Sequence, residues 1–105
     1  MKLVRLSSEA LDELFEAAVW YQARRSGLES EFLAEVDRVL PLIGSSPDAF
    51  PRLLDLPADL VIRRALLPRF PYALIFMDLG EHVRVLAVAH AKRRPGYWLD
   101  RLGTE

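Results

Sequence analysis

Residues 82–98 read HVRVLAVAHAKRRPGYW, and the rest of the chain is organised around this segment. Its first part, residues 82–90, is rich in valine, leucine and alanine and predicts a buried strand. The strand ends at His90 and leads into three consecutive cations, residues 92–94, and then an aromatic pair. Because a rigid strand can hold the side chains that follow it in a fixed geometry, we expect the functional end of the molecule here.

Two further strands precede this segment. Residues 61–67 and 72–78 are rich in β-branched, leucine and aromatic residues, with a proline-bounded turn between them. Leu79 and Gly80 make the next turn, before the strand at 82–90. Since both connections are short, we expect the three strands to form an antiparallel meander.

The first half of the chain predicts a strand followed by two helices. Residues 2–6 alternate polar and apolar side chains, as a short strand does. Ser7 and Ser8 provide a helix cap, and the first helix is expected from Glu9 to about Arg25, before a glycine. The second helix begins at about residue 28, and so short a link predicts an antiparallel helical hairpin.

Each helix has a predicted apolar face at helical spacing. The face of the first helix comprises Leu11, Leu14, Ala18 and Tyr21, widened by Phe15 and Val19, with Trp20 on a flank. The face of the second comprises Leu28, Phe32, Val36, Val39, Leu40 and Ile43. Pro41 lies inside the second helix, so we expect a kink or an early end there. Prolines then keep the chain irregular to about residue 59.

The predicted element order is β-α-α-β-β-β, followed by a short C-terminal helix or lid. This order predicts an α+β fold in which a helical hairpin covers one face of a small antiparallel sheet. A length of 105 residues fits a single domain, residues 1–105.

The composition excludes several kinds of site. There is no cysteine, which rules out disulfides and thiol chemistry and fits a cytoplasmic location. The sequence has no glycine-rich phosphate loop, no metal-ligand histidine spacing and no serine elbow, so we expect neither cofactor nor metal. Neither a signal peptide nor a membrane-spanning run is recognisable, so we expect no membrane association.

The net charge of −1 hides an uneven distribution. Residues 1–50 carry five Lys/Arg and nine Asp/Glu, which gives −4, whereas residues 61–101 carry eight and three, which gives +5. The basic half is expected to meet phosphates or an acidic protein, and the alternative is merely uneven surface charge.

Arginines accompany the first strand of the meander. Arg63 and Arg64 are adjacent and therefore point to opposite faces of the sheet, and Arg69 follows in the turn. One of the pair faces the side that the helices leave open, where an arginine can clamp a phosphate. The alternative is that both pair with acidic residues of the helices.

Residues 90–98, which we call the C-terminal cluster, offer further candidates. His90 beside Lys92, Arg93 and Arg94 is a candidate base near neutral pH, and the alternative is a structural histidine. Aromatic rings beside cations can stack on nucleobases, which makes Tyr97 and Trp98 candidate binding residues; the alternative is that they close the core as a lid. We favour the lid for the tryptophan and leave the tyrosine open.

Taken together, these features resemble the RelE/ParE superfamily, the toxins of bacterial type II toxin–antitoxin systems. The resemblance covers nearly the whole chain, and the order of its pieces is more specific than any one of them. These pieces are Trp20-Tyr21, residues 32–36, Pro47 with Phe50-Pro51, Arg63-Arg64, Phe70-Pro71-Tyr72, and His90 followed by Arg93-Arg94-Pro95 and Tyr97-Trp98.

The resemblance implies a cytoplasmic toxin that is neutralised by a cognate antitoxin, in a hetero-oligomer. RelE-like toxins cut mRNA on the ribosome, whereas ParE-like toxins, which include plasmid stabilisation proteins, poison DNA gyrase. The chain looks closer to the ParE side, with a ribonuclease or an inactive antitoxin-binding relative as alternatives.

If it is a ribonuclease, His90, Arg93 and Tyr97 are the catalytic candidates. Between the second helix and the first strand of the meander RelE-like enzymes carry lysines, whereas this chain has only Arg52 there, a departure from the ribonuclease pattern. Asp55 and Asp59 are candidate carboxylate partners.

Overall fold

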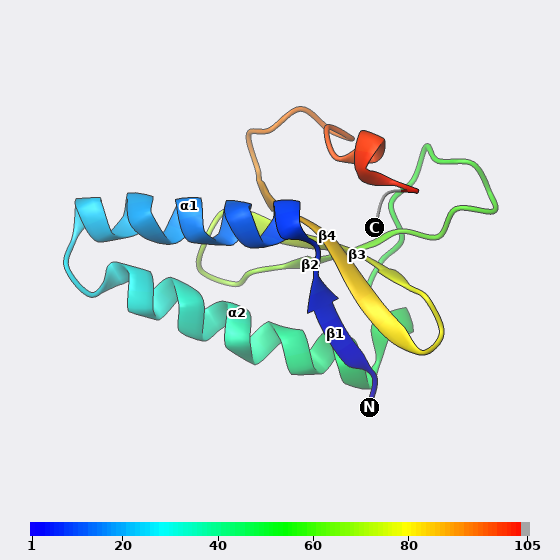
Figure 1. Ribbon diagram of the computed structural model, residues 1–105, viewed down its shortest axis with the longest axis horizontal. Coiled ribbons are helices and arrows are strands. Elements are labelled where there is room, and N and C mark those ends of the chain that lie inside the picture. Colours follow the sequence, from blue (N-terminus) through cyan, green and yellow to red (C-terminus); the bar gives the residue numbers. More distant parts are fainter. Residues whose placement is uncertain (104–105) are drawn as a thin grey trace.

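The computed structural model describes residues 1–103 and has two helices on one side of a four-stranded sheet (Figure 1). The element order confirms the predicted α+β fold, including a short helical turn near the C-terminus. The elements are β1 (Leu3–Leu6), α1 (Ser8–Arg24), α2 (Leu28–Ser45), the 3-10 turn η1 (Pro47–Ala49), β2 (Arg63–Leu66), β3 (Tyr72–Asp78), β4 (His82–His90) and the 3-10 turn η2 (Leu99–Arg101).

The strands lie in the order β1-β4-β3-β2. β2, β3 and β4 form the antiparallel meander that their short connections predict. β1 adds to the outer edge of β4 in the parallel direction, with Leu3 opposite His82, so the sheet is mixed rather than purely antiparallel. This parallel pairing is possible because the helical hairpin returns the chain to the far edge of the sheet before β2 begins.

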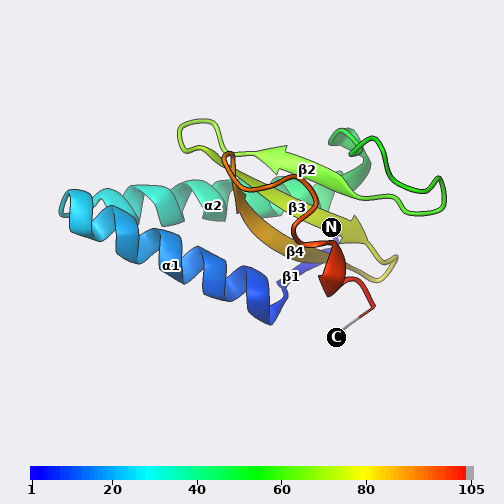
Figure 2. The same ribbon diagram turned by 90° about the horizontal axis from the view of Figure 1, so that it is seen from above.

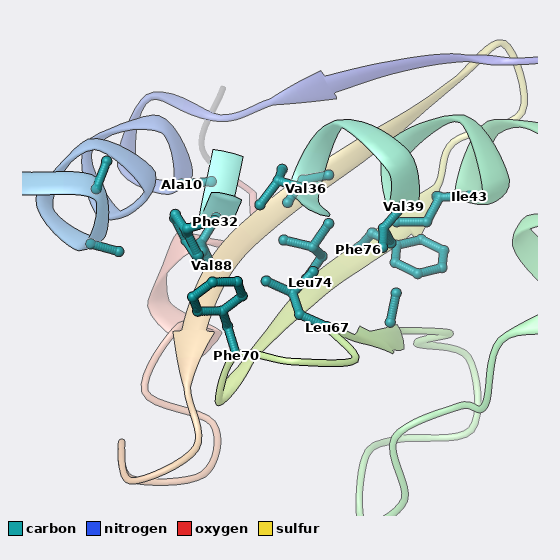
Figure 3. Close-up of a cluster of buried hydrophobic side chains, with 14 of the residues drawn as sticks. Ala10, Phe32, Val36, Val39, Ile43, Leu67, Phe70, Leu74, Phe76 and Val88 are labelled. Atoms are coloured by element: carbon teal, nitrogen blue, oxygen red, sulfur yellow. The ribbon is translucent and has the colours of Figure 1, made fainter. Parts of the chain in front are cut away.

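The main core lies between the helices and the sheet (Figure 3). Phe32, Val36 and Ile43 of α2 are at most 1% exposed and face Leu74 and Phe76 of β3. The apolar face predicted for the second helix is therefore confirmed.

The predicted face of α1 is partly wrong. Ala18 and Tyr21 are buried as expected, but Leu11, Phe15 and Val19 are 41%, 55% and 69% exposed. The inner face is instead completed by small residues, Ala10 and Ala17. Because alanine occupies little space, α1 packs with this face against the sheet, and the larger apolar residues turn outward.

α2 continues through Pro41 and ends at Ser45, so the early end considered for this helix does not occur. Proline removes one backbone donor, the one that would bond the carbonyl four residues earlier, at Asp37. Both residues lie on the exposed side of the helix, where water can bond that carbonyl.

A second apolar cluster covers the sheet face away from α2. Its buried members are Ile62, Ile75, Leu86, Ala87 and Trp98. The segment before β2 and the C-terminal segment supply its cover, and Figure 2 shows the C-terminal segment passing over the sheet. Within residues 1–103, no helix is both long and apolar enough to span a bilayer.

Gly44 allows the start of the chain to pack against the end of α2. Its carbonyl accepts a hydrogen bond from the Lys2 amide, and a Cβ at this position would lie 2.6 Å from the Lys2 carbonyl oxygen. Gly44→Ala is therefore expected to destabilise the fold by about 1–3 kcal/mol, although alanine favours a helix. Urea denaturation of Gly44→Ala and of Ser45→Ala, a control at the exposed neighbouring position, measures this loss. A denaturation midpoint of Gly44→Ala equal to that of the parent would contradict the prediction.

Candidate functional site

A groove of about 430 Å³ lies between the open face of the sheet and the C-terminal cluster. Ala73 and Ile75 of β3 and Ala89 of β4 line it from the sheet, and the two small alanine side chains leave room for a ligand or a partner's side chain. Its polar lining consists mainly of cations and a histidine: Arg64, His90, Arg93 and Arg94. A largely apolar hollow with a few convergent polar groups is the usual form of a binding site.

Glu13 of α1 holds the C-terminal segment in place. Its carboxylate accepts two hydrogen bonds from Arg101, at 2.8 and 3.0 Å, and one from the hydroxyl of Tyr97, at 2.7 Å. It also accepts the backbone N–H of Val88 at 2.9 Å. Burial would raise the pKa of Glu13, but these hydrogen bonds outweigh it and hold that pKa below its usual value.

Tyr97 is anchored by both its hydroxyl and its ring. Burial and the hydrogen bond to the Glu13 carboxylate raise the pKa of its hydroxyl well above the usual value. The guanidinium carbon of Arg93 lies 3.8 Å from the centre of the ring, in cation–π geometry. The tyrosine therefore supports Arg93, while its hydroxyl is directed at α1.

His90 lines the groove and is held by contacts with its neighbours. Its Nδ1 accepts the backbone N–H of Lys92 at 3.0 Å, and its ring meets Tyr72 edge-on at 5.0 Å. With Nδ1 as acceptor, the neutral ring carries its proton on Nε2 and so presents a donor. For His90 to act as a base, either Nδ1 must give up its bond to Lys92, or the ring must adopt the other tautomer, which also breaks that bond.

The fold separates the two arginines of β2 and the arginine of the following turn. Arg64 lines the groove and is the member of the adjacent pair that faces the side left open by the helices. Arg63 instead donates to the carbonyl of Phe50 at 2.7 Å. Arg69 lies against α2, where its backbone N–H and Nε donate to the buried Glu35 at 2.7 and 3.0 Å.

The remaining candidates add no exposed polar group to the groove, although the buried ring of Trp98 lines it. Lys92 lines a neighbouring groove beside α1. Trp98 is only 4% exposed and belongs to the second apolar cluster, so its ring acts as the lid that the sequence favours. Asp55 and Asp59 are exposed in the segment before β2, and neither lines the groove. Among the described residues, no group of three or more His, Asp or Glu is arranged to hold a metal ion.

Glu13, Arg101 and Glu35 are the residues that sequence reasoning misses. Glu13 is one of several acidic residues early in α1, and nothing in its spacing distinguishes it from exposed neighbours. Arg101 lies beyond the motif at residues 90–98. The only signal for Glu35 is that a carboxylate directly beside Val36, on the apolar face of a helix, requires a cation nearby.

Acid is expected to destabilise the fold through Glu13 and Glu35. Burial opposes ionisation of Glu35, yet hydrogen bonds from Arg69 and the charge of Arg38 keep its pKa below the usual value. A carboxylate with a lowered folded-state pKa stabilises the fold above its unfolded pKa of about 4.5, and this contribution is lost as pH falls through the lowered value. The melting temperature should therefore fall as the pH is lowered below about 4.5. The melting temperature of Glu35→Gln should fall less steeply with decreasing pH than that of Glu16→Gln, a control at an exposed position. Equal slopes would contradict the role given to the Glu35 carboxylate.

Comparison with solved structures identifies the fold. A chain of the "Chromosomal ParDE TA system from P. aeruginosa" superposes with a TM-score of 0.75 over 88% of this chain and 98% of that one. The chain therefore has a ParE-like fold. At 14% identity, the likeness concerns the arrangement of the helices and strands. No protein-family model matches the sequence, and no curated protein does.

The groove lies on the sheet face away from α2, beside the end of β4. The sequence-predicted candidates Arg64, His90, Arg93 and Arg94 all line it, and the Tyr97 ring, which also lines it, packs against Arg93. Arg63 and Arg69 are directed elsewhere by their hydrogen bonds.

Proposed function

We propose that this chain is the toxin of a type II toxin–antitoxin system and that it inhibits growth by binding a cellular target. The observation that carries the proposal is that the C-terminal cluster contains both exposed cations and side chains that are already bonded within the chain. Arg93 and Arg94 are exposed at the groove, while the Tyr97 hydroxyl and the His90 Nδ1 are already hydrogen-bonded within the chain. The likeness to a ParDE system supports a toxin–antitoxin role.

The same arrangement favours binding over RNA cleavage. Cleavage needs a base for the 2′-hydroxyl, cations for the phosphate and an acid for the leaving oxygen. The hydroxyl of Tyr97 has a raised pKa and a carboxylate acceptor, and His90 presents a donor. Exposed arginines beside an apolar hollow are instead typical anchors of protein interfaces.

DNA gyrase is the target that we propose, because the chain resembles ParE-like toxins more closely than RelE-like ones. A ribosome-dependent mRNA endonuclease is the second candidate, supported by Arg64, Arg93 and Arg94, which together form a basic lining suited to phosphate. An inactive relative that binds only the antitoxin is the third.

A cognate antitoxin is the proposed partner, in a cytoplasmic hetero-oligomer. Its C-terminal segment, extended or helical, is expected to cover part of the basic surface between residues 61 and 101. The uneven charge of the chain and the open groove support this arrangement. A complex that left Arg64, Arg93 and Arg94 fully exposed would contradict it.

Toxicity is expected to depend on the C-terminal cluster. The double variant Arg93→Ala/Arg94→Ala removes both exposed arginines and should abolish growth inhibition, since either target would lose its anchor contacts. The double variant Arg24→Ala/Arg25→Ala, an exposed pair at the far end of α1, is the matched control and should stay toxic. If both variants fold and inhibit growth as the parent does, the cluster is not the site.

His90→Gln distinguishes the two targets. Glutamine retains an acceptor for the Lys92 amide but cannot carry a proton between substrate and water. A gyrase-binding toxin should be unaffected, whereas a ribonuclease that uses the histidine should lose about a hundredfold or more in cleavage rate. Growth, mRNA cleavage and plasmid supercoiling are measured together after expression from a tightly controlled promoter. Altered supercoiling without mRNA cleavage supports gyrase, and the reverse pattern supports the ribosome.

A further inference from the structure

Two arginines lie side by side at the edge of the sheet, near the start of β4 and away from the candidate site at its end. Arg5 of β1 is directly opposite Arg84 of β4 in the parallel pairing of these strands (Figure 1). Val83 and Val85, the neighbours of Arg84 along β4, belong to the core beneath the helices. Both arginines therefore share the face of the sheet away from the helices. Like charges directly opposite each other destabilise a sheet, and an anion between them would offset the repulsion.

The two arginines differ in burial. Arg84 is 9% exposed and is the one buried cation within residues 1–103. It already takes part in an interaction within the chain, but a guanidinium group has five N–H donors, so an external acceptor can be bonded at the same time. Arg5 is exposed and has no hydrogen bond or ion pair within the same residues. The pair thus combines one cation held in a fixed position with one that is free to close on a ligand.

Both arginines line a groove of about 520 Å³ where β1 leads into α1, which we call the β1–α1 groove. His82, two residues before Arg84 and on the same face of β4, also lines it and can carry a further positive charge. The hydroxyl of Ser8 is an uncharged donor, held only by an exposed contact with the Glu9 carboxylate at 3.3 Å. Among the described residues that line this groove, Glu9 is the only acid, so positive charge predominates.

This lining favours a phosphate group over other anions. The N–H fork of arginine matches the oxygens of phosphate, and two arginines suit a group that carries nearly two negative charges near neutral pH. Among the described lining residues none is aromatic, and Leu6 is the one large apolar side chain, so the groove offers no ring on which a nucleobase could stack. Nucleic acids are bound through many phosphates, whereas this groove presents a single pair of arginines. A small phosphate compound is therefore the ligand that fits.

We propose that the β1–α1 groove binds the phosphate group of a small molecule, either free phosphate or a phosphomonoester. Arg5 and Arg84 donate to the phosphate oxygens from two neighbouring strands, and His82 and Ser8 supply further donors. The bound phosphate bridges β1 and β4 and so stabilises the attachment of the first strand to the sheet. The groove shares no lining residue with the candidate site, so its ligand is independent of the proposed function.

Thermal denaturation of the full chain in increasing inorganic phosphate, at constant pH and ionic strength, tests the proposal. The melting temperature should rise along a saturating curve, because the ligand binds only the folded chain. The rise should persist in Arg93→Ala/Arg94→Ala, which removes cations of the candidate site. No rise, or a rise that never saturates and so reflects a general salt effect, overturns the proposal. Phenyl phosphate in a parallel titration distinguishes the two sources: equal or tighter binding identifies a phosphomonoester site, and weaker binding identifies a site for free phosphate.

Charge variants assign the binding to this groove. Arg5→Gln, at an exposed position, should weaken phosphate binding by at least about tenfold, since one of the two guanidinium groups is lost. Glu9→Gln should tighten it by about threefold, because a negative charge leaves the lining. Arg24→Gln, at an exposed position near the other end of α1, is the matched control and should bind as the parent does. Equal affinities of Arg5→Gln and Arg24→Gln overturn the proposal, as does a duplex oligonucleotide that binds through Arg5 more tightly than phosphate.

Discussion

Replacing Glu13 by alanine is expected to lower the free energy of unfolding by about 3–5 kcal/mol, the range for breaking a mostly buried ion pair. The Glu13 and Arg101 side chains are only 12% and 14% exposed, at a separation of 2.8 Å. The substitution also removes the acceptor of the Val88 amide and of the Tyr97 hydroxyl. An unsatisfied buried donor costs about 1–3 kcal/mol, so the loss exceeds that of a surface charge.

Urea denaturation of three variants separates these contributions. Glu13→Gln retains an acceptor but loses the charge, and it should fall between the parent and Glu13→Ala. Glu16→Ala, at an exposed position of the same helix, should lie within about 0.5 kcal/mol of the parent. A cost below about 1 kcal/mol for Glu13→Ala would mean that the C-terminal segment is held by other contacts.

Phe32→Ala is expected to destabilise the fold by about 3–5 kcal/mol, the usual cost of emptying a buried aromatic site. Phe32 is completely buried, and its ring lies 5.1–5.4 Å from the rings of Tyr21, Phe70 and Tyr72. Loss of this ring would remove the contact surface shared by both helices and the loop before β3.

Phe15→Ala provides the matched control because it makes the same chemical change on α1. The Phe15 side chain is 55% exposed, so little buried area is lost and the cost should stay below about 1 kcal/mol. Thermal or urea denaturation of both variants measures the difference. Equal losses would mean that α1 is rotated relative to its position in this structure.

The sequence predicts α2 and the strands well because their apolar residues leave one choice of face. In α2, Phe32, Val36 and Ile43 recur at helical spacing, with exposed charges such as Asp37 on the other side. In the meander, the short turns restrict how consecutive strands can pair. Both signals depend only on residues close together in the sequence, so they can be interpreted without knowledge of the tertiary fold.

α1 could not be oriented in the same way. Leu11, Phe15 and Val19 form a stripe as regular as that of the buried residues, and large apolar side chains favour the wrong choice. The correct orientation depends on Ala17 packing near the sheet and on Glu13 reaching the Val88 amide. That amide is available only because β1 ends at Leu6, which is a property of the assembled sheet.

The charge distribution along the sequence indicates which half of the chain is basic. It does not indicate which cations are paired with carboxylates inside the fold and which line the groove. Arg69 and Arg101 are bound by Glu35 and Glu13, two acidic residues of the other half. Part of the uneven charge along the sequence is therefore neutralised by ion pairs between the helices and the C-terminal half. Arg64, Arg93 and Arg94 line the groove instead, so the candidate site is narrower than the basic segment from which it was predicted.

The pairing of β1 with β4 has a consequence for how the chain is made. Leu3 lies opposite His82, and Glu13 reaches Arg101, so β1 and α1 complete their contacts only when β4 and the segment after it are present. Contacts between residues so distant in sequence slow folding, because a long loop must close before they form. During synthesis, the nascent chain has a helical hairpin but no β4, and hence no assembled C-terminal cluster. The groove of the candidate site therefore forms only once β4 and the residues after it have been synthesised and have joined β1 and α1.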